Sequence, residues 1–553
     1  MNKQCQNCHK TFTIYPKDIE FYNRMEVPKP KLCPECRQQR RLAWCNEMVL
    51  YSRECPLCKK NILSIFSSNS LHNFYCHDCW WSDQWDPQDY AQEIDWHKNI
   101  FEQINELSLK TPLAAVSNSG RNTNCDYVHY CGDSKDCYLT FHADFNEKCY
   151  YGYGVKKCKD CIDIYNNFNC ELCFQCVDCH DSFNLKWSQD CTGCYDGYFL
   201  KDCVGCRNCF GAVGLRNQEY YFLDKQLSQL EYEKKIAGIE LSSYKEVQSW
   251  KQKTKQYQYK KFYKYIHGNK NENSTGNNLY RCKNLLEGFD CSDVENSKYC
   301  FQLSLKVNDS YDYYQYGMGS ELIYEGTIIG GNCYNLKFCH HCFDKCSYLE
   351  YCIECASCEN CFGCISLKKK EFCIFNKQYS ESEYFELKEK LVAKMIVDSE
   401  YGEYFPIKYS INAYNETSAA WWFPLNKEEA LNQGFNWQDN LPETKGKETI
   451  TDLPDNIRDI KDDIIKQVLA CEKCQKNYKI ISQELKYYKE HNLPLPRMCF
   501  NCRHLERRSL RNSRSLWNRE CQKPGCSNKF ATTYSPDRKE LIYCGDCYKK
   551  EIY

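Results

Sequence analysis

The stretch that decides the fold begins at Cys125 and reads CDYVHYCGDSKDCYLTFHADFNEKCYYGYGVKKCKDCIDIYNNFNC. Between Cys125 and Cys209 there are fifteen cysteines, and all are separated by multiples of three residues. As far as Leu215, this frame holds only small or apolar residues and Asn, whereas Asp, Lys and the aromatic residues occupy the other two frames. Such a restricted position faces a narrow interior, so the stretch predicts a solenoid of stacked coils.

We interpret each coil as 15 residues long, with strands stacked about 4.8 Å apart. Cut at this length, the sequence aligns cysteines in one column and aromatic residues in another. The cysteine column is Cys161, Cys176, Cys191 and Cys206, and the aromatic column is Tyr138, Tyr153, Phe168, Phe183 and Tyr198.

A second copy of the pattern begins at Gly276 and contains one extra residue between Cys342 and Cys346. The two copies end in similar phrases, CRNCFGAVGLRNQEYYFLDKQLSQLEY and CENCFGCISLKKKEFCIFNKQYSESEY, at a constant offset of 152 residues. The halves are therefore a duplication. We expect each solenoid to end in a polar helical cap that protects the open sheet edge.

Two pairs of cysteine sets lie outside the solenoids, one pair near each end of the chain. The outermost sets share the spacing CxxC-x24-CxxC at a constant offset of 466 residues, and each is followed by a second set. Four thiolates in two close pairs are typical of closed, tetrahedral structural zinc, so we expect about four zinc ions. The predicted ligands are Cys5, Cys8, Cys33 and Cys36; Cys55, Cys58, Cys76 and Cys79; Cys471, Cys474, Cys499 and Cys502; and Cys521, Cys526, Cys544 and Cys547. Cys45 is not counted as a ligand because Arg511 stands at its position in the other copy.

The predicted fold is therefore mainly β, with two parallel β-helix-like solenoids of 15-residue coils, flanked by tandem treble-clef and zinc-ribbon modules. We divide the chain into a treble clef (1–46), a zinc ribbon (47–90), a helical connector (91–109), the first solenoid with its cap (110–240), a basic Tyr/Lys linker (241–275), the second solenoid with its cap (276–396), an irregular connector with short helices (397–467), a second treble clef (468–515) and a second ribbon (516–553).

Composition limits the compartment and the partners. The chain has 553 residues, 42% hydrophobic content and a net charge of −1, which argues against coating nucleic acid by bulk electrostatics. No apolar stretch reaches the length of a membrane span, and MNKQCQNCHK begins with a ligand pattern rather than a signal peptide. Because many cysteines stand in Cys-x-x-Cys pairs without an export signal, we expect a cytoplasmic protein.

Two groups of basic residues are candidates for contact with nucleic acid. The predicted clef helices place arginines on one face, and a basic segment with interleaved tyrosines joins the solenoids. The candidates are Arg37, Arg40, Arg41, Arg503, Arg507, Arg508, Lys260, Lys261 and Lys264. A solvated helix face and a polar linker are the competing interpretations.

The first clef stretch, CQNCHKTFTIYPKDIEFYNRMEVPKPKLCPECRQQRR, resembles a small zinc-binding domain found in many bacterial proteins. The whole chain, including CHDCWWSDQWDPQDY, YIHGNKNENSTG and LPLPRMCFNCR, resembles uncharacterised cysteine-rich, multi-zinc-ribbon proteins of candidate-phyla bacteria. Neither resemblance implies a molecular activity.

No catalytic motif is present among the common nucleotide-binding, hydrolase and metalloprotease patterns, and the cysteine sets look closed. The sequence therefore favours a non-enzymatic zinc-binding scaffold that recognises a macromolecule, with RNA slightly ahead of protein. The remaining alternative is a soft-metal storage or thiol-redox protein that uses the 28 solenoid cysteines. These cysteines could instead simply fill a tight core.

Overall fold

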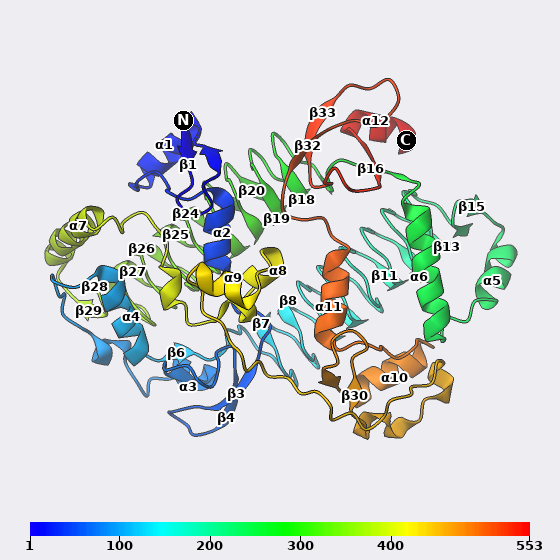
Figure 1. Cartoon of the computed structure of the whole chain (residues 1–553), viewed down its shortest axis with the longest axis horizontal. Coiled ribbons are helices and arrows are strands. Elements are labelled where there is room, and N and C mark those ends of the chain that lie inside the picture. The colour runs from blue at the N-terminus through cyan, green and yellow to red at the C-terminus, as the bar shows by residue number, and fades with distance from the viewer. Residues whose placement is uncertain (553) are drawn as a thin grey trace.

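The computed structural model describes residues 1–552 and contains two β-solenoids, flanked by the cysteine-containing modules of the two ends (Figure 1). Each coil is a series of triplets in which one residue has positive φ, as at Asp160, Asp163 and Asn166. Asn, Asp and Gly adopt this conformation most readily, and they occupy most of these corners in the first solenoid. The residue before each corner forms a parallel bridge to the adjacent coil, and the residue after it points inward. The mainly β solenoid architecture is thus confirmed.

The predicted coil length is wrong. The parallel register joins Glu147 to Lys159 and Tyr195 to Arg207, so a coil of the first solenoid consists of four triplets, whereas the predicted coil has five. A cysteine in the same place of every triplet is compatible with either length, so the columns aligned at the predicted length carried no independent information. Aromatic residues accordingly stack between positions that are four triplets apart, as Tyr153 does on Tyr165 with ring centroids 5.1 Å apart.

The second solenoid changes its coil length along its axis. Near its start Gly276 pairs with Gly288, and near its end Ser347 pairs with Glu359, so these coils again consist of four triplets. Between them Val294 pairs with Val307 and Tyr334 pairs with Ser347, so the middle coils are one residue longer. Leu305 and Lys306 both have positive φ, which accommodates one extra residue at a corner. The extra residue predicted between Cys342 and Cys346 lies in one of these longer coils.

Cysteine suits the interior because its side chain is small and carries a weak hydrogen-bond donor. The Cys170 thiol, for example, contacts two backbone carbonyl oxygens, of Phe168 at 3.4 Å and of Cys179 at 3.3 Å. The same pattern recurs along both interiors. Burial raises the pKa of Cys131 to about 12, so this thiol stays neutral near pH 7. All 45 cysteines of the chain are free.

The first solenoid follows strand β6 (Leu113–Ala114) and ends in helix α5 (Gln229–Ala237). Its strands are β7 (His129–Gly132), β8 (Phe141–Asp144), β9 (Glu147–Tyr150), β10 (Lys159–Ile162), β11 (Phe183–Lys186), β12 (Tyr195–Tyr198), β13 (Arg207–Phe210), β14 (Tyr221–Phe222) and β15 (Lys225–Gln226). The segment that joins the solenoids contains α6 (Tyr244–Gln258) and β16 (Phe262–Lys264).

The second solenoid ends in helix α7 (Glu381–Val397). Its strands are β17 (Gly268–Asn269), β18 (Gly276–Tyr280), β19 (Gly288–Ser292), β20 (Val294–Glu295), β21 (Phe301–Ser304), β22 (Val307–Asn308), β23 (Tyr314–Gly317), β24 (Glu321–Tyr324), β25 (Tyr334–Lys337), β26 (Ser347–Glu350), β27 (Glu359–Phe362), β28 (Glu371–Ile374) and β29 (Lys377–Gln378).

The N-terminal modules contain short hairpins and helices. These are β1 (Asn2–Gln4), β2 (Thr11–Thr13), α1 (Pro16–Arg24), α2 (Pro34–Leu42), β3 (Tyr51–Glu54), β4 (Asn61–Ser64), β5 (Phe74–Tyr75), α3 (His77–Trp81), η1 (Pro87–Tyr90) and α4 (Ile100–Lys110). After α7 come η2 (Ile407–Tyr409), η3 (Tyr414–Glu416), α8 (Ala419–Trp422), α9 (Lys427–Asn432), η4 (Ile457–Asp459) and η5 (Asp462–Lys466). The C-terminal modules then contain β30 (Leu469–Ala470), β31 (Asn477–Tyr478), α10 (Ser482–Glu490), α11 (Phe500–Ser509), β32 (Trp517–Glu520), β33 (Lys529–Thr532), β34 (Leu541–Tyr543) and α12 (Gly545–Ile552).

The end modules dock on the solenoids in a crossed arrangement. The N-terminal clef helix α2 lies against the second solenoid, and the C-terminal clef helix α11 lies against the first (Figure 1). Each ribbon instead pairs with the strand that precedes a solenoid, β5 with β6 and β34 with β16. Within residues 1–552, no helix combines the length and apolar character that a bilayer span requires.

Candidate metal centres and the cleft between the solenoids

The sixteen predicted ligands form four tetrads, and in each tetrad the sulfur atoms all lie within 4.8 Å of one another. Neighbouring Sγ atoms lie 3.7 Å apart in Cys8–Cys33 and Cys474–Cys499, and 3.9 Å apart in Cys58–Cys76 and Cys526–Cys544. A tetrahedral ion with metal–sulfur bonds of about 2.3 Å requires sulfur atoms about 3.8 Å apart. The four tetrads therefore have the geometry to bind metal ions.

Backbone amides donate hydrogen bonds to some of these sulfur atoms and so lower their pKa. The N–H of Cys33 donates to Cys5 Sγ at 3.3 Å, and that of Cys76 donates to Cys55 Sγ at 3.4 Å. Burial opposes ionisation, but such hydrogen bonds lower the pKa of Cys5 to about 6 and that of Cys55 to about 7. In the C-terminal tetrads, the pKa of Cys471 falls to about 7 through backbone amides, including that of Cys499. Thiolate, the form that binds metal, is thus favoured at Cys5, Cys55 and Cys471, whereas burial raises the pKa of Cys79 and Cys502 in the same tetrads.

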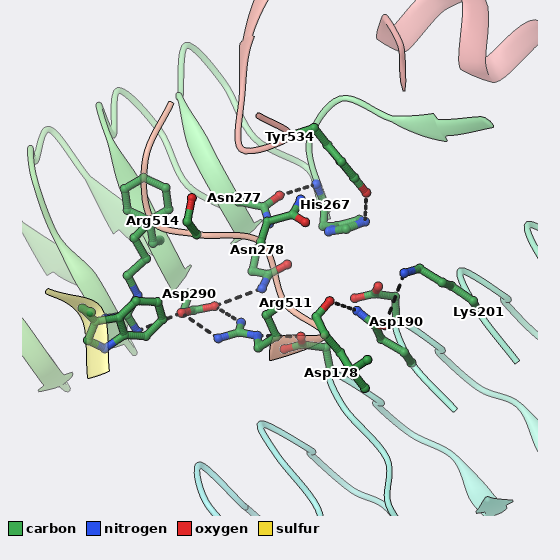
Figure 2. Close-up of a pocket in the computed structure, with 16 residues that line it drawn as sticks. Asp178, Asp190, Lys201, His267, Asn277, Asn278, Asp290, Arg511, Arg514 and Tyr534 are labelled. Atoms are coloured by element: carbon green, nitrogen blue, oxygen red, sulfur yellow. Dashed lines mark hydrogen bonds and ion pairs between the residues drawn. The ribbon is translucent and has the colours of Figure 1, made fainter. Parts of the chain in front are cut away.

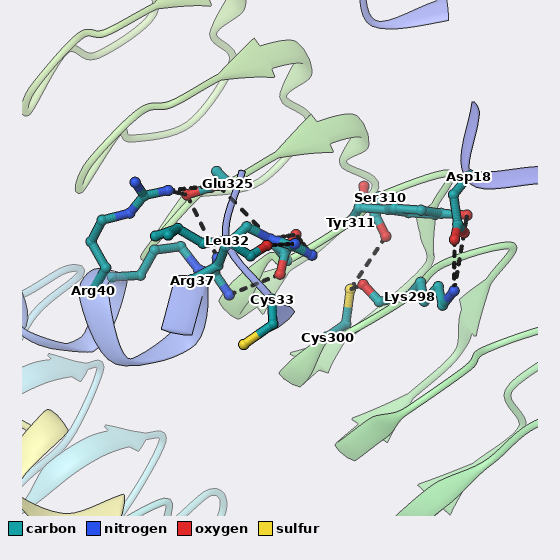
Figure 3. Close-up of polar contacts among 12 residues, drawn as sticks. Asp18, Leu32, Cys33, Arg37, Arg40, Lys298, Cys300, Ser310, Tyr311 and Glu325 are labelled. Carbon is teal, nitrogen blue, oxygen red and sulfur yellow. Dashed lines mark hydrogen bonds and ion pairs between the residues drawn. The ribbon is translucent and has the colours of Figure 1, made fainter. Parts of the chain in front are cut away.

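The N-terminal clef joins the second solenoid through buried ion pairs (Figure 3). Arg37 contacts the Asp312 carboxylate at 2.8 Å, and Arg41 contacts it at 3.2 Å. Arg40 donates to both oxygens of Glu325 at 2.9 Å. Asp312 occupies a corner of a coil with φ of 64°, and Glu325 follows one coil later.

The C-terminal clef joins the first solenoid through equivalent residues. Arg503 and Arg507, each 466 residues after Arg37 and Arg41, lie 3.3 and 2.8 Å from the Asp163 carboxylate. Asp163 is also a corner residue, with φ of 57°, and it is fully buried. The duplication therefore extends to the contacts between clef and solenoid.

These contacts correct the prediction that the clef arginines form a phosphate-binding face. Arg37, Arg40, Arg41, Arg503 and Arg507 point into the molecule and pair with carboxylates. Their helical spacing did place them on one face, but that face is the one that packs on the solenoid. Their charges are already compensated.

The other four predicted nucleic-acid contacts have different surroundings. Arg508 packs over the rings of Trp421 and Trp422, and Lys261 packs over Tyr257. Lys260 is exposed, and half-buried Lys264 lies in β16 next to the C-terminal ribbon. Nucleic-acid contact by these four residues stays a prediction.

A cleft of about 910 Å³ lies between the two solenoids, with the N-terminal ribbon helix α3 at its edge. Half-buried rings from both solenoids line it, namely Tyr130, Phe168, Tyr280, Tyr316 and Phe343. Trp80 and Trp81 of α3 also line the cleft. Four lysines, Lys156, Lys345, Lys368 and Lys369, and four aspartates, Asp83, Asp144, Asp290 and Asp344, also line the cleft. The sequence did not predict this cleft because it depends on how the two solenoids face one another.

Of the eight charged residues that line the cleft, one aspartate is paired with cations outside this set. Asp290 pairs with Arg511 and with Arg514, the latter at 3.1 Å. Among residues 1–552, no ion pair is formed by the four cleft lysines, nor by Asp83, Asp144 or Asp344. The cleft thus offers four cationic and three anionic groups without an ion pair, next to aromatic faces.

Beside the cleft, Glu47 forms the centre of a buried polar cluster. Its carboxylate accepts hydrogen bonds from the hydroxyls of Tyr153, at 2.5 Å, and Tyr314, and lies 2.9 Å from His142 Nε2. Burial opposes ionisation, but His142 and the two hydroxyls lower the pKa of Glu47. His142 lines the cleft. Because these residues come from three distant segments, no sequence motif marks the cluster.

Comparisons with known proteins do not assign the chain to a family. No protein-family model matches this sequence, and a search of curated proteins finds no significant similarity. The resemblance to zinc-ribbon proteins therefore stays an expectation from the sequence, and the four cysteine tetrads are the part of it that the structure supports.

Proposed function

We propose that this protein is a zinc-stabilised scaffold that binds a segment of single-stranded nucleic acid, with RNA as the first candidate, in the cleft between its solenoids. The observation that supports it is the cleft lining, which combines ring faces from both solenoids with four lysines that have no ion pair in residues 1–552, against three aspartates that have none. Proteins bind single strands through this combination of stacking surfaces and positive charge. Because the chain is nearly neutral, nucleic acid would have to bind at a local site, and the cleft is the site that we propose.

Zinc is the metal that we propose for the four tetrads. Four thiolates with sulfur atoms 3.7 to 3.9 Å apart suit a tetrahedral ion without an open position. Such ions stabilise small modules that have little hydrophobic core of their own. Their proposed role here is to hold the clefs and ribbons that position the two solenoids.

The storage alternative receives little support from the interior. Within residues 1–552, no group of three or more clustered ligand residues includes a cysteine of the solenoid interiors. The only solenoid residues in such a group are His340 and His341. The interior thiols instead face backbone carbonyls, as in Cys170. A non-enzymatic scaffold is accordingly the form of the proposal that we favour.

The test is binding of a short single-stranded RNA to the full-length, zinc-loaded chain across a range of salt concentrations. We expect the logarithm of the affinity to fall linearly with the logarithm of salt, by about 0.7 for each phosphate contacted. The double variant Lys345→Glu/Lys369→Glu should weaken binding and flatten this slope. Lys225→Glu, which changes an exposed lysine outside the cleft, is the matched control.

A second pair of variants tests the stacking surfaces. Replacing Phe168 or Tyr280 by Ala should cost about 1–3 kcal/mol of binding free energy if a base stacks there. Absence of RNA binding at low salt, or equal effects of the cleft and control variants, would contradict the nucleic-acid proposal. Binding of a protein or peptide in the same cleft would then become the leading explanation.

A further inference from the structure

A fifth group of potential metal ligands lies outside the four tetrads. It comprises Cys45, which closely follows helix α2, and His340 and His341, from the coil between β25 and β26. One ligand atom from each residue lies within 4.8 Å of the others, and all three residues are at least 97% buried. Sequence analysis did not count Cys45 as a ligand, and no short spacing joins it to the histidine pair, because the two belong to distant parts of the chain.

The histidines have the surroundings of metal ligands. His340 Nδ1 is buried and has no hydrogen-bond partner, which is costly for a polar atom inside a protein. His341 Nε2 contacts the Tyr130 hydroxyl, and its Nδ1 lies 3.9 Å from a Glu354 carboxylate oxygen. Partners of this kind orient metal-binding histidines in proteins.

The duplication provides an internal comparison. Arg511 stands 466 residues after Cys45, and Asp190 stands 151 residues before His341, one less than the 152-residue offset because the extra residue follows His341. Figure 2 shows that the corresponding place in the other half holds the Arg511 guanidinium, which contacts Asp290 and lies 2.7 Å from Asp178. One half therefore fills this place with its own cation. The other half supplies a thiol and two imidazoles in its stead.

We propose that Cys45, His340 and His341 bind a divalent transition-metal ion, with zinc as the reference case. One thiolate and two imidazoles suit zinc and its neighbours better than calcium or magnesium. Binding draws the ligand atoms together to about 3.3–3.8 Å and releases the Cys45 proton.

This site differs from the four tetrads in its coordination. Three protein ligands leave a fourth position for water or another group, as in catalytic zinc sites, whereas the tetrads are closed. Tyr130, which contacts His341, also lines the cleft, so the ion lies directly behind the cleft wall. This inference is independent of nucleic-acid binding, since it concerns only the metal content.

The test is elemental analysis of the full-length chain after equilibration with zinc and removal of free metal. We expect five ions per chain, and four in the double variant His340→Ala/His341→Ala. The matched control is Gln189→Ala/Asp190→Ala, which changes the corresponding positions in the other half and should retain five. Four ions in the unaltered chain, or five in the histidine variant, would overturn the proposal.

A second measurement does not depend on folding of a variant. The chain is loaded with cadmium-113 and labelled with nitrogen-15 at histidine, and its cadmium NMR spectrum is recorded. We expect four resonances from thiolate-only sites and a fifth that is coupled to imidazole nitrogen. Four uncoupled resonances alone would exclude the site.

Discussion

The two clefs, 466 residues apart, dock on their solenoids by the same central contact but with different surroundings. In both, two arginines of the clef helix face one buried aspartate at a coil corner, Asp312 or Asp163. Around Asp312, Arg40 pairs with Glu325 and Lys298 pairs with Asp18. The shared contact explains the docking, and the neighbours differ.

Around Asp163, each neighbouring position has been replaced. Glu506 stands where the first clef has Arg40, and its partner is Lys251 of α6 at 3.8 Å. Lys251 also donates to Gln175, which occupies the position of Glu325. Glu484 stands where the first clef has Asp18, and it accepts from the Tyr151 hydroxyl at 2.8 Å instead of facing a lysine. The charge is thus reversed at Arg40 and Glu506 and lost at Glu325 and Gln175, so each clef forms a polar network that the residues of its own solenoid complete.

Loss of a metal ion should have the largest effect on the contact between a clef and its solenoid. Cys36→Ser and Cys502→Ser each remove one ligand, and structural zinc contributes on the order of 10 kcal/mol to the folding of a small module. We expect each variant to lose one ion and to release only its own clef, as measured by elemental analysis and limited proteolysis. Release of both clefs by one variant would show that the docks are not independent.

Removal of the corner aspartates should have the next largest effect. Asp163→Asn leaves Arg503 and Arg507 buried without a counter-charge, which costs about 3–5 kcal/mol. After Asp312→Asn, the Glu325 carboxylate still lies 3.9 Å from Arg37 and 3.7 Å from Arg41. We expect a loss in the free energy of unfolding for both variants by denaturant titration, and the larger loss for Asp163→Asn. A loss at only one dock would contradict the equivalence of the two contacts.

The acids at matched clef positions should differ in their pH response. Burial raises the pKa of Glu484 from 4.5 to about 7, so the folded state binds its proton more tightly than the unfolded state. The resulting stabilisation is complete below about pH 4.5 and is lost as the pH rises through 7, a change of up to about 3 kcal/mol.

Glu484→Gln should therefore flatten the dependence of stability on pH between 5 and 8, measured by denaturant titration at each pH. The matched variant Asp18→Asn instead leaves buried Lys298 without its carboxylate and should destabilise the chain. If Glu484→Gln changes the pH profile no more than Asp18→Asn does, the missing lysine is not the important difference.

A charge exchange at the outer positions should have the smallest effect. Gln175→Glu places a carboxylate next to Lys251. It should stabilise the contact between the C-terminal clef and the first solenoid by up to about 1 kcal/mol, since the lysine is only partly exposed. Glu325→Gln should destabilise the contact between the N-terminal clef and the second solenoid, because Arg40 and Arg41 lose a carboxylate. Thermal unfolding of both variants measures the contrast, and effects of the same sign would argue against distinct networks.

Much of the solenoid could be predicted from the sequence because one frame of every triplet excludes charges and rings. The coil length could not, since any whole number of triplets satisfies that frame. A better signal was the alternation of charge in the outward frame at every fourth triplet, Lys135, Glu147, Lys159 and Glu171, which are bridged coil to coil. The corner frame, rich in Asp, Asn and Gly, also marked the turns.

The sequence by itself determined the local features of this protein: the inward cysteines, the duplication and the four tetrads, because each depends on residue types at short spacing. Only the tertiary structure decided which face of each clef helix is buried, that the clefs cross to the opposite solenoid, and that Cys45 meets His340 and His341. These outcomes depend on contacts between residues that are far apart in the chain, which obey no short spacing and are selected by charge pairing and packing when the modules dock.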